Sequence, residues 1–292
     1  MQLAHRRAWL IGVLLALQVA AAAAFFVLFW GEDAGLTPLA EAAHRTSEYP
    51  GARLTLEGRL QVPGEGTVFT MEGQGEYNGT TGLSRIVFDM DPPPGEAAKF
   101  LGGRIQIEQL GEERPGTVVT YLRSLAFGPL PGGAQWLKID HTEYVDAQMQ
   151  SFDPRDQLEM LRSTDDFRRV GGERVRGVPT TRYRATIDYR DEIERLRDEG
   201  QDTAAETLEK EIAANDGADT EPVEVWVAHD KTIRRFRMWM PFSYDMWPKG
   251  TTILATLELY DFGIEPEIEL PVESQAFDIT EIAREELDRL AE

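Results

Sequence analysis

Alternating apolar and polar residues dominate the middle of the chain. The clearest case lies between residues 53 and 62, where every second side chain is apolar and those between are polar or charged. A period of two predicts a β-strand with one buried face and one face in water. The apolar positions of this strand are Leu54, Leu56, Leu60 and Val62.

Similar patterns predict more strands joined by turns. Pro63-Gly64-Glu65-Gly66 leads into a second strand with Phe69 and Met71 facing inward, and Asn78-Gly79 predicts a hairpin before a third strand. That third strand carries Ile86, Phe88 and Met90. Further strands are expected at 104–110, 117–122, 135–140, 167–170, 181–189, 223–227, 233–240 and 251–262.

Helical spacing appears only between these strands or at the ends of the domain. It predicts helices at 37–46, 153–163 and 280–290, and a pair of short helices within 191–214. Nine to eleven antiparallel strands with helices in the connections predict an α+β domain. The sheet must be strongly curved if its single apolar face is to wrap around a core.

A different pattern precedes this domain. The 23 residues from Ala8 to Trp30 contain no charge, with Arg6 and Arg7 before them and Glu32 and Asp33 after them. A helix of this length is roughly 34 Å long, enough to cross a hydrocarbon core of about 30 Å. The basic flank predicts that the N-terminus stays in the cytoplasm and the rest lies outside.

Two interpretations of this apolar run remain open. Small residues at 20–24 are typical of a cleavable signal peptide, which would release a secreted protein. The apolar residues continue through 25–30, however, and this length favours an uncleaved transmembrane anchor. The expected organisation is an N-terminus and anchor at 1–30, a linker at 31–36 and an extracytoplasmic domain at 37–292.

Charge and composition exclude some partners and some chemistry. The part after residue 30 has 28 basic and 51 acidic residues, a formal charge of −23. Nucleic acid is not an expected partner, because its binding depends on cationic side chains, and attraction to anionic lipid is disfavoured for the same reason. The absence of cysteine excludes thiol catalysis, disulfides and a lipid-modified cysteine.

No catalytic or metal-binding signature is present. The histidines His5, His44, His141 and His229 lack metal-ligand spacing, and no serine lies in a GxSxG motif. Two acidic clusters, Asp89 with Asp91 and 140–146, are interpreted as solvated surface in a chain this acidic. We therefore expect no enzyme, no metal and no cofactor.

Basic and aromatic residues gather near the C-terminal strands. Arg234, Arg235 and Arg237 are close in sequence to Trp226 and Trp239. This pattern is compatible with cation-π contacts or recognition of a lipid phosphate. It is more typical of solvated strand positions that pair with nearby acids, which is the favoured interpretation.

Several stretches resemble one family of exported bacterial proteins. They are VRGVPTTRYRATIDY at 175–189, PVEVWVAHDKTIRRFRM at 222–238 and TLELYDFG at 256–263, with QWLKID at 135–140 in support. In order and spacing they resemble the LolA-like lipoprotein-carrier superfamily, particularly envelope lipoproteins of the actinobacterial LppX and LprG type. The resemblance covers residues 37–279, with the segment at 191–214 as a variable helical insertion.

The resemblance implies a half-barrel whose concave apolar face is covered by helices and receives acyl chains. Unlike the LppX and LprG type, this chain has no lipobox cysteine, and the predicted anchor takes its place. The first hypothesis is therefore a single-pass protein of the bacterial cell membrane that binds a lipid or lipidated molecule. The expected lining residues are Leu54, Leu56, Phe69, Met71, Phe88, Met90 and Trp136.

Two alternatives remain. The same fold with a filled core would serve as a non-enzymatic sensor or interaction module that contacts an envelope protein. An enzyme acting on cell-envelope material would require an acid and base pair, which the sequence does not reveal.

Overall fold

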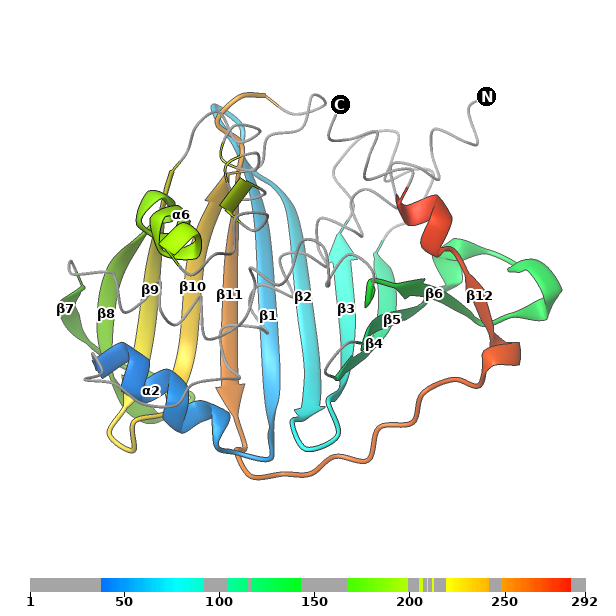
Figure 1. Ribbon diagram of the computed structural model, residues 1–292, viewed down its shortest axis with the longest axis horizontal. Helices are drawn as coiled ribbons and strands as arrows, with labels where there is room; N and C mark the ends of the chain where they lie inside the picture. Colours follow the sequence, from blue (N-terminus) through cyan, green and yellow to red (C-terminus); the bar gives the residue numbers. More distant parts are fainter. Residues whose placement is uncertain are drawn as a thin grey trace.

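The computed structural model describes residues 38–91, 104–114, 117–142, 167–198, 219–241 and 248–284, together with 205, 206, 209 and 212. Within these residues twelve strands form one sheet in the order β12-β6-β5-β4-β3-β2-β1-β11-β10-β9-β8-β7. Figure 1 shows that the sheet is curved, with β4, β5 and β6 turned away from the direction of β8–β11. The curved α+β sheet expected from the sequence is confirmed.

The first half of the sheet is an antiparallel meander. It consists of β1 (Gly51–Val62), β2 (Gly66–Asn78), β3 (Leu83–Asp91), β4 (Ile105–Arg114), β5 (Thr117–Arg123) and β6 (Trp136–Asp140). A short last strand, β12 (Ala276–Asp278), pairs parallel to β6. This parallel pair, which the alternation did not predict, brings the C-terminal part of the domain back to its first half.

The second half runs back toward the first strand. It consists of β7 (Arg168–Val175), β8 (Val178–Asp188), β9 (Thr220–Ala228), β10 (Ile233–Pro241) and β11 (Thr252–Tyr260). Neighbours are antiparallel, and β11 pairs with β1 so that Leu56 stands opposite Leu257. The two meanders are thus joined through β1 and β11.

Two helices are described at length, α2 (Pro38–Ser47) and α6 (Tyr189–Asp198). Proline suits the first turn of a helix, and α2 ends shortly before Pro50 and Gly51, as expected. The Thr46 hydroxyl donates to the Ala42 carbonyl at 2.6 Å and accepts the Ile233 amide at 2.8 Å, which ties α2 to β10. Three short 3-10 helices, η1 (Leu125–Phe127), η2 (Pro131–Gly133) and η4 (Glu273–Gln275), lie in connections.

The sheet has two chemically different faces. We call the face that α2 covers the inner face and the opposite one the outer face. Leu39, Ala42 and Ala43 of α2 pack in one apolar cluster with strand residues, and Figure 1 shows α2 crossing β9 and β10. The core of the domain therefore lies on the inner face.

Local turn chemistry explains which hairpins the sequence reveals. At the predicted Asn78-Gly79 hairpin, Asn78 Oδ1 accepts the amides of Thr80 and Thr81 at 3.0 and 3.1 Å. The β7–β8 hairpin turns at Arg176 and Gly177, with φ of 47° and 81°. Arg-Gly is a weak hairpin signal. The predicted strands at 167–170 and 181–189 are consequently longer in the structure and adjacent.

Some expectations concern residues outside the described part. These include the helix at 153–163, the linker and the apolar run from Ala8 to Trp30. Residues 280–284 are helical, in agreement with the start of the expected last helix. Among the residues described, no helix is both long enough and apolar enough to span a bilayer.

Candidate functional site: the inner face of the sheet

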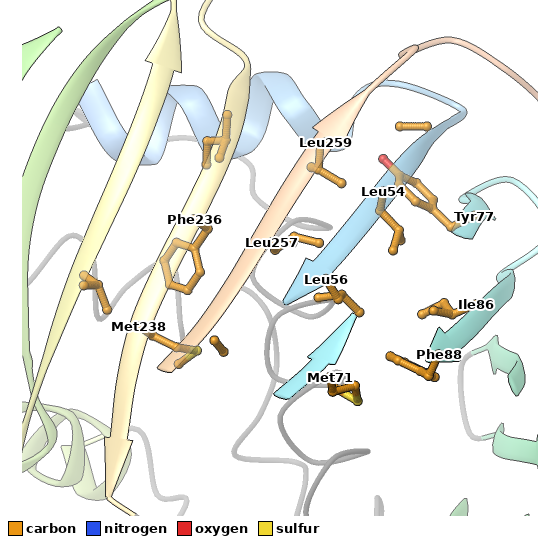
Figure 2. Packing of buried hydrophobic residues seen from close by; sticks show 14 of the residues in the cluster. Leu54, Leu56, Met71, Tyr77, Ile86, Phe88, Phe236, Met238, Leu257 and Leu259 are labelled. Atoms are coloured by element: carbon orange, nitrogen blue, oxygen red, sulfur yellow. The ribbon is translucent and has the colours of Figure 1, made fainter. Parts of the chain in front are cut away.

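A continuous apolar layer covers the inner face from β3 to β9. Figure 2 shows side chains from neighbouring strands pointing into this layer, among them Leu54, Leu257 and Phe236. On these strands apolar residues recur at every second position, valines on β9 and mostly leucine, methionine, isoleucine and phenylalanine on the others, so the strand period puts them on one face. The inner face therefore carries a broad apolar surface, which is buried in the folded chain.

Most of the predicted lining residues meet on this surface. Leu54, Leu56, Met71, Phe88 and Met90 belong to one cluster and are at most 7% exposed. The sixth, Phe69, is partly buried and packs against the same cluster. Whether they contact a ligand stays a prediction.

Trp136 lies on the other face. In β6 the residues Leu137 and Ile139 join the inner cluster, so Trp136 points outward one position earlier. The Arg123 guanidinium stacks over its ring at 4.4 Å from the centroid. The sequence contained this signal, because Trp136 shares its strand period with Lys138 and Asp140 rather than with Leu137.

Three glycines lower the central part of this apolar surface, because glycine has no side chain. Gly58, Gly73 and Gly75 fall on the inner face of β1 and β2, in register with Met71, Phe88 and Ile86 respectively. A Cβ atom on Gly73 would lie 2.8 Å from ring carbons of Phe88, so this ring occupies the space above the glycine. The phenylalanine therefore lies flat on the strand and forms a shallow apolar floor.

The second meander supplies lining residues that the sequence list omitted. Val225, Phe236, Met238 and Leu257 are buried in the same cluster as the predicted residues. Phe236 and Met238 were visible as apolar positions at 233–240. They lie near Leu56 because β1 pairs with β11, and sequence patterns do not specify this pairing.

Two carboxyl groups, Glu221 buried and Glu113 half-buried, interrupt the apolar character of the inner face. Glu221 follows the same strand period as Val223 and is 3% exposed. Burial raises its pKa to about 7, although a hydrogen bond from the Tyr189 hydroxyl opposes this shift. Burial likewise raises the pKa of Glu113, on β4, to about 7.

These acids do not form a catalytic pair in the part of the chain that is described. Glu221 and Glu113 lie on β9 and β4, with five strands between them, and no hydrogen bond or ion pair among the described residues connects them. Within the same part, no group of three His, Cys, Asp or Glu side chains is placed to hold a metal ion. Of the acidic cluster at 140–146, Glu143 and Asp146 lie outside the described residues.

Comparison with known proteins identifies relatives of the whole domain. No family model matches the chain. An uncharacterized 31.2 kDa protein of Streptomyces griseus, from the rplA-rplJ intergenic region, is 25% identical over 252 residues. The match covers 79% of this chain and 75% of that protein.

Solved structures of two mycobacterial lipoproteins are similar to the chain. The crystal structure of Mycobacterium tuberculosis lipoprotein LppX matches 80% of this chain and 96% of its own, with 9% identity and a TM-score of 0.46. That of LprF from Mycobacterium bovis matches 82% and 99%, with 13% identity and a TM-score of 0.40.

Proposed function

We propose that this protein is a membrane-anchored extracytoplasmic protein that binds an acyl chain of a lipid or lipidated molecule against the inner face. The observation that supports this most is the apolar surface, which runs without a break from β3 to β9 and has a floor lowered by glycines. Residues 8–30 would hold the domain at the membrane. This anchor keeps any transfer of cargo within reach of the bilayer.

The energetics of this surface suit an acyl chain. Each methylene group removed from water contributes about 0.8 kcal/mol, so ten methylenes contribute about 8 kcal/mol before the costs of ordering. Met71, Met90 and Met238 lie in the surface, and methionine side chains adapt their shape to irregular apolar partners. Micromolar binding needs about 8 kcal/mol after those costs, so without a charged contact it requires a chain longer than about ten methylenes.

A matched pair of substitutions tests the proposal. Gly58→Leu adds an apolar side chain above the floor, where its Cβ would lie 3.3 Å from the Met71 methyl carbon and 3.8 Å from the Met71 Cβ. Glu57→Leu adds the same side chain one position away on the outer face. The full chain, in nonionic detergent, is labelled with a fatty acid that carries a photoactivatable diazirine, and the attached peptides are identified by mass spectrometry.

The expected result is labelling of inner-face peptides of β1, β2 and β3. Gly58→Leu should reduce this labelling about tenfold, because a tenfold loss corresponds to the contact of one to two buried methylene groups. Glu57→Leu should leave the labelling unchanged. Labelling confined to residues 8–30 or to outer-face positions, in protein that unfolds normally, would overturn the proposal. Such labelling would indicate that side chains already fill the inner face. It would favour the sensor or interaction module.

A further inference from the structure

The outer face of β8, β9 and β10 carries an ordered set of arginines. Arg182 and Arg235 stand opposite Trp226 on its two neighbouring strands, and Arg184 and Arg237 stand opposite Glu224 in the same way. We call these four arginines with Glu224 and Trp226 the arginine array. Because Trp226 and Glu224 are 1% and 0% exposed, the arginines form the outward surface.

The array holds more positive than negative charge. Arg182, Arg184 and Arg237 all pair with the single carboxylate of Glu224, with Arg184 at 2.6 Å and Arg237 at 3.7 Å. Among the described residues they have no second carboxylate within 4 Å. Arg168, which stands opposite Arg184 on β7, is exposed and has no ion pair within that part of the chain.

Arg235 is different because it is fully paired. Its guanidinium donates to Glu258 at 2.6 Å and also pairs with Glu173. Arg235 therefore anchors the array to β11 and β7, while the other three arginines have capacity to bind an additional anion.

Unsatisfied polar atoms lie in the same place. The indole Nε1 of Trp226 and the Nε of Arg182 are buried and have no hydrogen-bond acceptor among the described residues. Such donors are costly to bury without a partner. Both donors lie beside three arginines that share one carboxylate, whose Oε2 is also without a hydrogen-bond partner among the described residues, so donors outnumber acceptors here.

The stacking geometry leaves the arginines ready to bind oxygen atoms. The guanidinium carbons of Arg182, Arg235 and Arg237 lie 5.1, 5.1 and 5.2 Å from the centroid of the Trp226 ring. A guanidinium that stacks on an aromatic face keeps its N–H groups in its own plane, where they bind phosphate oxygens in pairs. Arg182, Arg184 and Arg237 are 30%, 46% and 29% exposed, so such a group can reach them.

The chain also indicates the source of the phosphate. Seven residues, 31–37, separate Trp30, the end of the predicted anchor, from Pro38, so the eight steps from one to the other span at most about 29 Å when fully extended. Because α2 starts at Pro38 and packs on β9 and β10, an anchor at residues 8–30 would hold this half of the sheet within that distance of the bilayer. We propose that the arginine array binds the phosphates of anionic phospholipid headgroups. This inference rests on the membrane anchor of the proposed function, but the surface is separate from the inner face and does not depend on a ligand there.

The absence of cysteine allows a direct test with single labels. A nitroxide is attached to Thr186→Cys, on the exposed outer face of β8 beside Arg184, or to Gln74→Cys, on the exposed outer face of β2. The full chain is reconstituted in nanodiscs of phosphatidylcholine, or of a two-to-one mixture of phosphatidylcholine and phosphatidylglycerol. Electron paramagnetic resonance then measures how often each label collides with a water-soluble nickel chelate.

Phosphatidylglycerol should lower the collision rate at position 186 about threefold and leave position 74 unchanged. The triple variant Arg168→Gln, Arg184→Gln, Arg237→Gln should abolish this effect while Arg182 still pairs with Glu224. A control variant, Arg53→Gln, Arg104→Gln, Arg114→Gln, has the same net charge and should retain the effect, since these arginines lie on other strands.

Three results would overturn the proposal. One is an equal response of both labels, and another is an equal loss in both triple variants, because either would indicate general charge attraction. The third is an effect of inorganic phosphate in phosphatidylcholine discs without an effect of phosphatidylglycerol, which would identify free phosphate as the ligand.

Discussion

On one face of β9, Val223, Val225 and Val227 are buried among apolar side chains, whereas on the other face Glu224 and Trp226 are buried beneath arginines. The same strand thus uses two kinds of cover. The apolar cover excludes water through shape and area, and the arginine cover does so through long side chains that remain partly wet. Burial alone therefore does not distinguish a core position from a charged surface site.

Removing the largest inner-face side chain of β10 should have the greatest effect on stability. Phe236→Ala creates a cavity in the apolar cluster and should lower the free energy of unfolding by about 4 kcal/mol. Trp239→Ala, on the outer face of the same strand and only half-buried, should cost clearly less. Urea unfolding of the full chain in nonionic detergent measures the free energy of unfolding of both variants. Equal losses of this free energy would contradict a core on the inner face.

The inner face should also make stability depend on pH through Glu221. Burial raises its pKa from 4.5 to about 7 in the folded protein. As pH rises from about 4.5 to 7 the unfolded chain loses this proton first, so the folded state loses about 3 kcal/mol of stability over this window. Below pH 4.5 both states hold the proton, and no loss occurs.

Glu221→Gln removes the titrating group and should abolish that share of the pH dependence. The variant should be more stable than the parent protein at pH 8 and similar to it at pH 4.5. Comparison of unfolding midpoints at the two pH values measures this difference. Parallel curves for both proteins would show that Glu221 titrates normally.

The outer face should depend on its one buried carboxylate. Burial by itself raises the pKa of Glu224, but hydrogen bonds from Arg184 and Arg182 outweigh it and lower the pKa. Glu224→Gln leaves the arginines without their shared counterion and should cost about 2 kcal/mol. Arg237→Gln removes only the longest ion pair to Glu224, 3.7 Å, and should cost below about 0.5 kcal/mol. Thermal unfolding in detergent compares the two variants.

Strand patterns predicted much of this sheet, because a half-buried strand leaves a period of two in its sequence. They predicted β1, β2 and β3 with their inner side chains, but β7 was too short in the prediction since only Val175 is buried in it. The placement of Trp136 on the inner face was wrong, although the period of β6 contained the correct answer. Glu221 was missed because its burial beside Tyr189 depends on tertiary packing.

Charge was the property that the sequence described least well. The whole chain is strongly acidic, and this average disfavoured contact with anionic lipid. The arginine array arises only when β8 and β10 flank β9, which places Arg184 and Arg237 on opposite sides of Glu224. Local charge therefore follows strand register, which net charge cannot represent.

The pairing of β1 with β11 also constrains when this domain can fold. Leu56 meets Leu257 across that pair, so the first strand waits for nearly all of the domain before it gains one of its two neighbours. Contacts between such distant residues slow folding and leave strand edges exposed meanwhile. A chain that passes through a membrane from its N-terminus would thus emerge with its sheet incomplete, and its last strands would complete the structure on the far side.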